Sequence, residues 1–126
     1  MTQFISAAFI VSNGKVLLVK QRKQNKWSLP KGKAKENEEP LDTLLRELKE
    51  ETSLDLTTVR VSRSKSFSYI SKFGNVKNVR LFFIKLNSLS NDVLNFSSKE
   101  IEKVVLFDLE EGLNKINKHY KKAILE

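Results

Sequence analysis

Hydrophobic positions near the N-terminus follow the alternation of two β-strands joined by a tight turn. Two apolar, β-prone runs at residues 4–11 and 15–21 flank the dipeptide Asn13-Gly14. Both residues tolerate a positive φ, which a two-residue hairpin turn requires, so this spacing is a strong hairpin signal. We therefore predict an antiparallel hairpin, followed by a short extended segment at 27–30.

The periodicity becomes helical after Pro40, which suits the first position of a helix because an N–H would be unpaired there anyway. The apolar stripe consists of leucines at i, i+3, i+4 and i+7: Leu41, Leu44, Leu45 and Leu48. This pattern is typical of an amphipathic helix with one face toward a core. We predict a helix from about Pro40 to Thr52, preceded by a polar loop at 31–39.

The C-terminal half mixes strand-like segments with a helical end. Strand-like patterns occupy 56–64, 65–71 and 78–86, with a break at Gly74-Asn75, and 104–109 predicts a last strand. Residues 87–100 lack periodicity and predict a loop, whereas 109–124 predicts one or two helices. In 126 residues, this order of strands, helix, strands and helix predicts one mixed α/β domain spanning 1–126.

Composition narrows the chemistry that a functional site can use. The sequence contains no cysteine and a single histidine, His119. Disulfides, cysteine-ligated zinc and multi-histidine metal sites are therefore excluded. Any metal must be held by oxygen ligands, which favours hard cations such as Mg²⁺ or Mn²⁺.

The N-terminal apolar run has no basic residue before it and is too short to span a bilayer. We therefore expect neither a signal peptide nor a membrane segment, and a soluble, cytoplasmic protein with no membrane partner. The sequence leaves the oligomeric state open.

Charge is segregated along the chain. The formal net charge is +8, from 23 lysines and arginines against 15 acids. No acid precedes Glu36, eight acids crowd residues 36–55, and none occurs in 56–91. A generally basic composition would explain the net charge but not this segregation. One acidic cluster in basic surroundings suits an anionic ligand that arrives with divalent cations.

Three acids of the predicted helix share one flank. Glu47, Glu50 and Glu51 are spaced i, i+3 and i+4, so their carboxylates repel one another. Arg46 can offset only one of these charges. The helix alone therefore allows two interpretations, a solvated charged face or a carboxylate cage for Mg²⁺, whose octahedral coordination needs several oxygen ligands.

Residues upstream of the helix decide between these interpretations. Gly32 is followed by five residues and Glu38, then by seven residues and the run Arg46-Glu47-Leu48-Lys49-Glu50-Glu51-Thr52-Ser53-Leu54. This spacing resembles the Nudix box, G-x5-E-x7-R-E-U-x-E-E-x-G-U, in which U is aliphatic. Every charged position matches, and Ser53 is the one defined position that departs, where the family has glycine. The resemblance implies a Nudix-type α/β/α sandwich with a mixed β-sheet, a loop leading into the box helix, and a C-terminal helix.

The resemblance also implies a set of metal ligands. The backbone carbonyl of Gly32 would bind the metal, because glycine permits close approach. The carboxylate ligands would be those of Glu47, Glu50 and Glu51, with Mg²⁺ as the cofactor and Mn²⁺ as its substitute. Ser53 replaces a glycine suited to a left-handed helix end, which costs on the order of 1 kcal/mol without removing a ligand.

For catalysis, the resemblance implies roles for Glu47, Glu50, Arg46 and Glu100. Arg46 would hold a carboxylate in place by a charge-assisted hydrogen bond. Glu38 would brace the loop or support the ligands from behind. The general base would be Glu47 or, outside the box, Glu100, although a solvated acid before a strand is an equally good interpretation of Glu100.

The activity that the resemblance implies is hydrolysis of a nucleoside diphosphate linked to another moiety. Segments 67–75 and 79–86 look most like the dinucleoside polyphosphate hydrolases, which would split diadenosine tetraphosphate into ATP and AMP. Three alternatives remain: sanitation of oxidised nucleoside triphosphates, processing of RNA 5′ ends, which a basic surface favours, and a Nudix module that only binds nucleotides or RNA.

Two kinds of residue are expected to contact such a substrate. Lys31 and Lys33 flank the metal loop and would neutralise phosphates that Mg²⁺ does not reach. The candidates to clamp a base are aromatic: Phe67, Tyr69, Phe73 and, more distant, Tyr120. Alternating aromatic residues in a strand are, however, more often part of a core.

Overall fold

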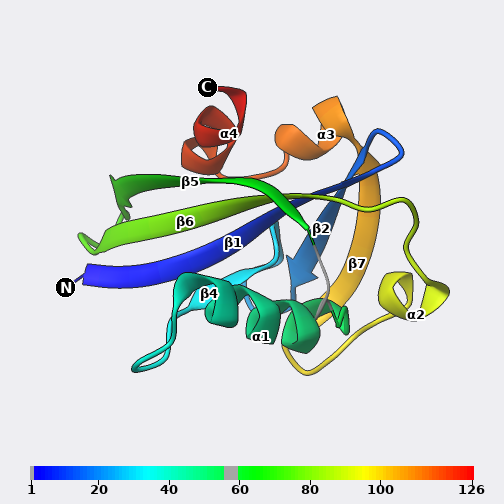
Figure 1. Ribbon diagram of the computed structural model, residues 1–126, viewed down its shortest axis with the longest axis horizontal. Coiled ribbons are helices and arrows are strands. Elements are labelled where there is room, and N and C mark those ends of the chain that lie inside the picture. Colours follow the sequence, from blue (N-terminus) through cyan, green and yellow to red (C-terminus); the bar gives the residue numbers. More distant parts are fainter. Residues whose placement is uncertain (1, 56–59) are drawn as a thin grey trace.

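The chain folds into a mixed β-sheet with helices against both faces (Figure 1). The computed structural model describes residues 2–55 and 60–126. The strands are β1 (Thr2–Ser12), β2 (Lys15–Gln21), β3 (Lys26–Ser28), β4 (Lys31–Lys33), β5 (Val61–Ile70), β6 (Val76–Lys85) and β7 (Ile101–Asp108). The helices are α1 (Pro40–Thr52), α2 (Asn91–Leu94), α3 (Leu109–Leu113) and α4 (Lys118–Leu125). In Figure 1, α1 lies on one side of the sheet, and α3 and α4 lie on the other.

Strand β1 organises the sheet because three strands pair with it. It runs parallel to β6 along most of its length, and antiparallel to β2 and β4. The main path of the sheet is β3-β2-β1-β6-β5, with β4 paired to β1 and β7 paired to β2. Parallel and antiparallel pairs in one sheet between helices confirm the predicted mixed α/β sandwich.

The structure confirms the predicted hairpin and box helix. Asn13 and Gly14 join β1 to β2 with φ angles of 52° and 77°. Helix α1 has the predicted bounds, and Leu44 and Leu48 are buried in one core cluster with residues of β1 and β6. Leu41 is 43% exposed, so the apolar contact with the sheet begins one turn into the helix.

Three segments differ from the sequence-based expectation. Residues 31–33, predicted as loop, form β4, because strand pairing uses backbone groups that even a Lys-Gly-Lys segment supplies. The short helix α2 lies within the segment predicted as loop. The strands predicted at 56–64 and 65–71 are not separate: β5 runs through residue 64 without a break. Residues 56–59 of the first predicted strand lie outside the described residues.

The predicted last strand and helical C-terminus are also present, as β7, α3 and α4. None of the helices in 2–55 and 60–126 has the length and apolar character needed to cross a bilayer.

The end of α1 carries the one departure from the box pattern. Ser53 has φ 61° and ψ 6°, a left-handed conformation, and its N–H donates to the Lys49 carbonyl at 3.0 Å. A side chain in this conformation costs about 1 kcal/mol relative to glycine. The helix therefore ends in a slightly strained residue two positions after Glu51.

We expect Ser53→Gly to stabilise the protein by about 1 kcal/mol, which corresponds to about 3–5 °C in melting temperature for a domain of this size. Thermal unfolding followed by circular dichroism measures the change. Ser53→Ala is the control, because alanine keeps the Cβ that makes the conformation costly. An equal rise in both variants would contradict this account.

Candidate active site

Gly32 of β4 lies directly against Glu47 of α1. A Cβ built on Gly32 would overlap the carboxylate carbon of Glu47, so any other residue at this position would displace the Glu47 side chain. Gly32 pairs with Ser6 of β1, and the Ser6 hydroxyl donates to the Pro40 carbonyl at 2.7 Å. Strand β4 and the start of α1 are thereby held on the same stretch of β1.

Glu51 is a buried acid near the C-terminal end of α1. Its exposed fraction is 8%, and its Oε1 accepts a hydrogen bond from the Lys31 N–H at 2.9 Å. Burial raises the pKa of Glu51 to about 8, the Lys31 N–H opposes this rise, and the charge of Glu47 adds to it. Burial also raises the pKa of Glu47, against the hydrogen bond from Arg46. Two such acids cost stability unless a cation balances their charge.

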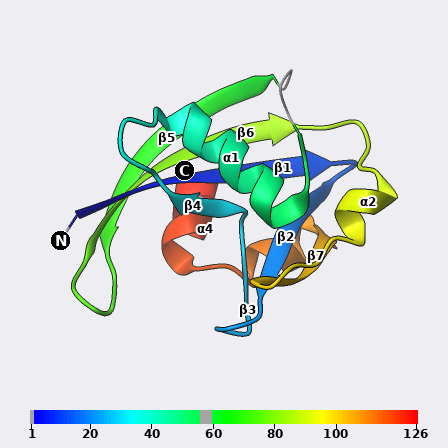
Figure 2. The same ribbon diagram turned by 90° about the horizontal axis from the view of Figure 1, so that it is seen from below.

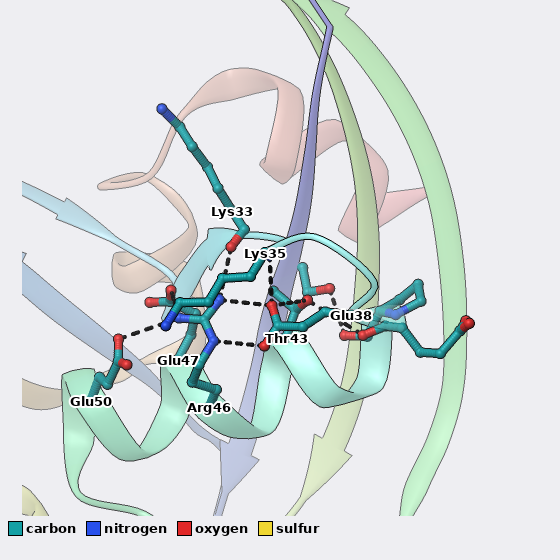
Figure 3. Close-up of polar contacts among 10 residues, drawn as sticks. Lys33, Lys35, Glu38, Thr43, Arg46, Glu47 and Glu50 are labelled. Carbon is teal, nitrogen blue, oxygen red and sulfur yellow. Dashed lines mark hydrogen bonds and ion pairs between the residues drawn. The ribbon is translucent and has the colours of Figure 1, made fainter.

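Arg46 connects the box helix to the loop before it (Figure 3). Its Nε and Nη2 donate to the two carboxylate oxygens of Glu38 at 2.8 and 2.9 Å. Its Nη1 donates to Glu47 at 2.7 Å, and its Nη2 also donates to the Lys33 carbonyl at 2.9 Å. Glu50 is exposed and lies farther from Nη1, at 3.5 Å. One guanidinium therefore fixes the loop and the Glu47 carboxylate together.

Glu38 holds the loop through further hydrogen bonds. Its Oε1 accepts from the Lys35 N–H at 2.7 Å and from the Thr43 hydroxyl at 3.0 Å. The hydrogen bond from Arg46, followed by that from the Lys35 N–H, lowers the pKa of Glu38 to about 2. Glu38 is therefore ionised at neutral pH and ties the loop to the first turns of α1.

The donor set of this site suits a hard divalent cation. Within 2–55 and 60–126, no three acidic or histidine side chains lie together as a ready-made metal site. Instead, Glu47 is bonded to Arg46 and Glu51 to the Lys31 N–H. The candidate donors are all oxygens. Burial raises the pKa of Glu47 and Glu51, and a divalent cation would stabilise their ionised forms against this effect. The residues present therefore fit Mg²⁺ or Mn²⁺.

Glu100, the predicted acid outside the box, lies immediately before β7. It is exposed, and its carbonyl accepts a hydrogen bond from the Arg22 N–H at 2.9 Å. Its charge contributes to the raised pKa of Glu47 and of Glu51. The fold thus brings Glu100 to the same part of the molecule as the box acids.

Lys31 and Lys33 alternate with Gly32 along β4, so their side chains leave the strand on the face opposite to Glu47. Figure 3 shows the Lys33 side chain directed away from α1. The Lys31 ammonium lies 5.2 Å from the centre of the Tyr120 ring. Burial lowers the pKa of Lys31, an effect that the charge of Glu51 opposes.

The predicted aromatic residues form a packed group beneath α4. Tyr69 stacks on His119 with ring centres 4.5 Å apart, and its ring centre lies 5.9 Å from that of Tyr120. Phe67 meets Tyr120 edge-to-face at 5.2 Å. Tyr120, predicted as more distant, is therefore central to the group, and it is only 2% exposed. Phe73 is 81% exposed in the turn between β5 and β6, outside this group.

Sequence reasoning missed Lys77 of β6. The parallel pairing of β6 with β1 places Lys77 opposite Gln3, and its ammonium donates to the Gln3 side chain. The charge of Lys77 is one of the causes that lower the pKa of Lys31. Lys77 and Gln3 are 74 positions apart, so no local pattern could have brought them together.

Known proteins provide an independent test of this geometry. A family model, the NUDIX domain, matches residues 2–126. The chain belongs to the Nudix family. This match confirms the family resemblance of the box. Nudix hydrolases generally use divalent metals such as Mg²⁺.

Relatives in sequence include mRNA-decapping proteins. The mRNA-decapping enzyme subunit 2 of Saccharomyces cerevisiae is 33% identical over 106 residues, 82% of this chain and 10% of the relative. The mRNA-decapping protein g5R of African swine fever virus is 32% identical over 123 residues, 87% of this chain and 50% of the relative. The Nudix chain thus spans a tenth of the yeast protein and half of the viral one.

Solved structures share the fold at lower identity. A C. elegans Ap4A hydrolase in a binary complex has a TM-score of 0.83 at 21% identity, covering 98% of this chain and 93% of that one. A MutT Nudix hydrolase from Burkholderia pseudomallei has a TM-score of 0.73 at 18% identity, covering 99% and 97%.

Replacing Glu38 tests the loop anchor. Because folding lowers its pKa from 4.5 to about 2, the ionised form contributes stability above pH 4.5 that is lost as the pH falls toward 2. We expect Glu38→Gln to melt several degrees below the wild type at pH 7, and the difference to shrink as the pH falls below 4.5. Thermal unfolding across this pH range measures both quantities.

Glu36→Gln, which changes an exposed acid of the same loop, is the matched control and should melt with the wild type at every pH. A gap between Glu38→Gln and the wild type that stays constant with pH would show that the charge of Glu38 is not what matters.

Proposed function

We propose that this Nudix chain is a Mg²⁺-dependent hydrolase that cleaves an anhydride bond of the phosphate chain at the 5′ end of RNA. The main support is the placement of two acids with raised pKa, Glu47 and Glu51, against the Gly32 strand. Such oxygens suit the hard cations that accompany a polyphosphate. Residues 1–126 would act as a single Nudix domain.

The residues of the site have three proposed roles: binding the cation, orienting Glu47 and accepting the proton of the attacking water. The cation ligands would be the Gly32 carbonyl and the carboxylates of Glu47, Glu50 and Glu51. When bound, Mg²⁺ polarises the phosphate and lowers the pKa of the attacking water. Arg46 orients Glu47 through the 2.7 Å hydrogen bond and is itself held by Glu38. The proton of the water would pass to Glu47 or to Glu100, the more exposed of the two.

RNA is favoured as the substrate for two reasons. The relatives at 32% and 33% identity are mRNA-decapping proteins, whereas the likeness to an Ap4A hydrolase, at 21% identity, concerns the fold. In addition, the chain carries a net charge of +8 and no acid in 56–91, which suits contacts with a phosphate backbone.

A dinucleoside polyphosphate is the second candidate, favoured by the aromatic group beside Lys31. The Lys31 ammonium lies against Tyr120, which contacts Tyr69. A phosphate of the substrate would bind Lys31, and a base would stack on a neighbouring tyrosine ring. However, one face of Tyr69 is already stacked on His119, which a base would have to displace to use it. A module that only binds nucleotides has no need of the mutual repulsion between the box acids.

We expect Glu51→Gln to abolish hydrolysis without unfolding the protein. Glutamine can still accept the hydrogen bond from the Lys31 N–H but has no charge to offer a cation. Saturating Mg²⁺ should therefore raise the melting temperature of the wild type but not of the variant, since a ligand stabilises only the form that binds it. Thermal unfolding with Mg²⁺ and with EDTA, together with turnover, measures both effects.

Glu111→Gln, at an exposed acid of α3, is the control and should behave as the wild type in both assays. Retained turnover in a folded Glu51→Gln protein would refute the assignment of the metal site.

A substrate panel separates the candidates. With Mg²⁺, we expect capped and 5′-triphosphorylated RNA to exceed diadenosine tetraphosphate and oxidised dGTP in kcat/KM. Activity on RNA should fall steeply with added salt, because each phosphate contact releases counterions. If diadenosine tetraphosphate ranks first, the second candidate is correct, and if no compound is hydrolysed, the enzymatic proposal fails.

A further inference from the structure

Helix α1 covers only part of its face of the sheet. The core cluster beneath it contains Ala8 and Ile10 of β1 and Phe82 of β6. Residues 2–6 of β1, with the adjoining parts of β5 and β6, extend past the start of the helix (Figure 2). There a groove of about 810 Å³ is lined by these three strands and by the loop 33–40. The floor of this groove is bare sheet, and its wall is the loop of the Nudix box.

The pairing register identifies the side chains of the floor. Even-numbered residues of β1 face α1, because Ala8 and Ile10 pack beneath that helix. The same face carries two rows across the sheet: Phe4, Asn78 and Ser68, and then Ser6, Arg80 and Ser66. Phe4 is 63% exposed, and the Nε of Arg80 donates to the Ser66 hydroxyl at 2.9 Å. An aromatic ring and an oriented guanidinium are thus presented to the groove.

The charges around the groove suit an anionic occupant. Strands β5 and β6 contain no aspartate or glutamate, so Arg80 is uncompensated by acids of its own strand or the neighbouring β5. The acids of the lining, Glu36 and Glu38, belong to the loop wall together with Lys35. Glu38 is already paired with Arg46. The lining thus contains three basic side chains, Lys33, Lys35 and Arg80, against one acid, Glu36, that is not paired with Arg46.

The groove adjoins the candidate active site. Lys33 and Glu38 line it, and both accept hydrogen bonds from Arg46, which also holds Glu47. Only the Arg46 side chain therefore separates these groove residues from Glu47, a proposed metal ligand. Residues 2–6 of the floor span about 13 Å at the usual rise of a strand, which suits a few nucleotides.

We propose that this groove binds the single-stranded RNA that follows the cleaved 5′ end. Phe4 stacks on a base, Arg80 binds a phosphate, and the polar side chains at Ser66, Ser68 and Asn78 contact 2′-hydroxyl groups. The proposal rests on the proposed function, because it names how the body of that RNA substrate is held. Small nucleotides end before the groove, so it discriminates RNA from them without taking part in the chemistry.

Fluorescence anisotropy with a short labelled RNA that ends in a 5′-hydroxyl tests the groove. This probe has no anhydride bond, so its binding is independent of hydrolysis. We expect Phe4→Ala to weaken binding at least about fivefold through the lost stacking. Arg80→Ser should weaken binding and reduce the slope of log affinity against log salt by about 0.7, the value for one phosphate contact on a single strand.

Two matched controls change similar groups far from the groove. Leu125→Ala removes an exposed apolar side chain of α4, and Lys103→Ser removes a positive charge of β7. Both should bind the probe as the wild type does, and circular dichroism should show that all four variants are folded.

Several results would overturn the proposal. These are unchanged affinity in both Phe4→Ala and Arg80→Ser, an equal loss in the controls, and equal affinity for DNA of the same sequence. A wild type that does not bind RNA, with dimers in light scattering that Phe4→Ala abolishes, would assign the groove to a second copy of the chain.

Hydrolysis assays keep this proposal distinct from the proposed function. If the probe binds through Phe4 and Arg80 but no RNA 5′ end is hydrolysed, the groove assignment stands and the proposed activity fails. If RNA 5′ ends are hydrolysed equally by the wild type and by Phe4→Ala, with equal probe affinity, the activity stands and the groove assignment fails.

Discussion

The bidentate pair between Arg46 and Glu38 is the interaction on which the candidate site depends. It joins the polar loop before α1 to the middle of that helix, and no residue of 33–39 belongs to either described core cluster. Through the same guanidinium it reaches the Glu47 carboxylate and the Lys33 carbonyl. A lysine could not replace it, because a single ammonium lacks the planar fork that serves several acceptors at fixed angles.

Helix α1 contains several destabilising features near the candidate metal ligands. Glu51 is buried with a raised pKa, Glu47 lies beside it, and two residues later Ser53 adopts a left-handed conformation. The buried like charges and the non-glycine side chain in a left-handed conformation each lower the stability of the helix. Destabilising features that gather within the last two turns of a helix are typical of functional sites, since the rest of the fold must compensate for them. Here the compensation comes from the buried leucines of α1 and from the pairing of β4 with β1.

Local patterns in the sequence predicted most of the elements and the acidic centre. Asn13-Gly14 specifies its own turn, the leucine spacing specifies α1, and the fixed distance from Gly32 to the helix identifies the box. What the sequence did not show depends on partners far along the chain. β4 is a strand only because β1 lies beside it, and Tyr120 meets Tyr69 only because α4 folds back over β5. The groove has the same origin, since its floor combines residues of three strands.

Strand β4 is only three residues long, and its alternation decides which charge meets the box acids. Gly32 faces Glu47, while the lysines on either side of it face away. A slip of the pairing by one residue would exchange these faces, because the side-chain period of a strand is two. A lysine ammonium would then sit on Glu47 and form an internal salt bridge there. The register of one three-residue strand thus keeps the lysine ammonium groups off Glu47 and leaves its carboxylate available for the cation of the proposed function.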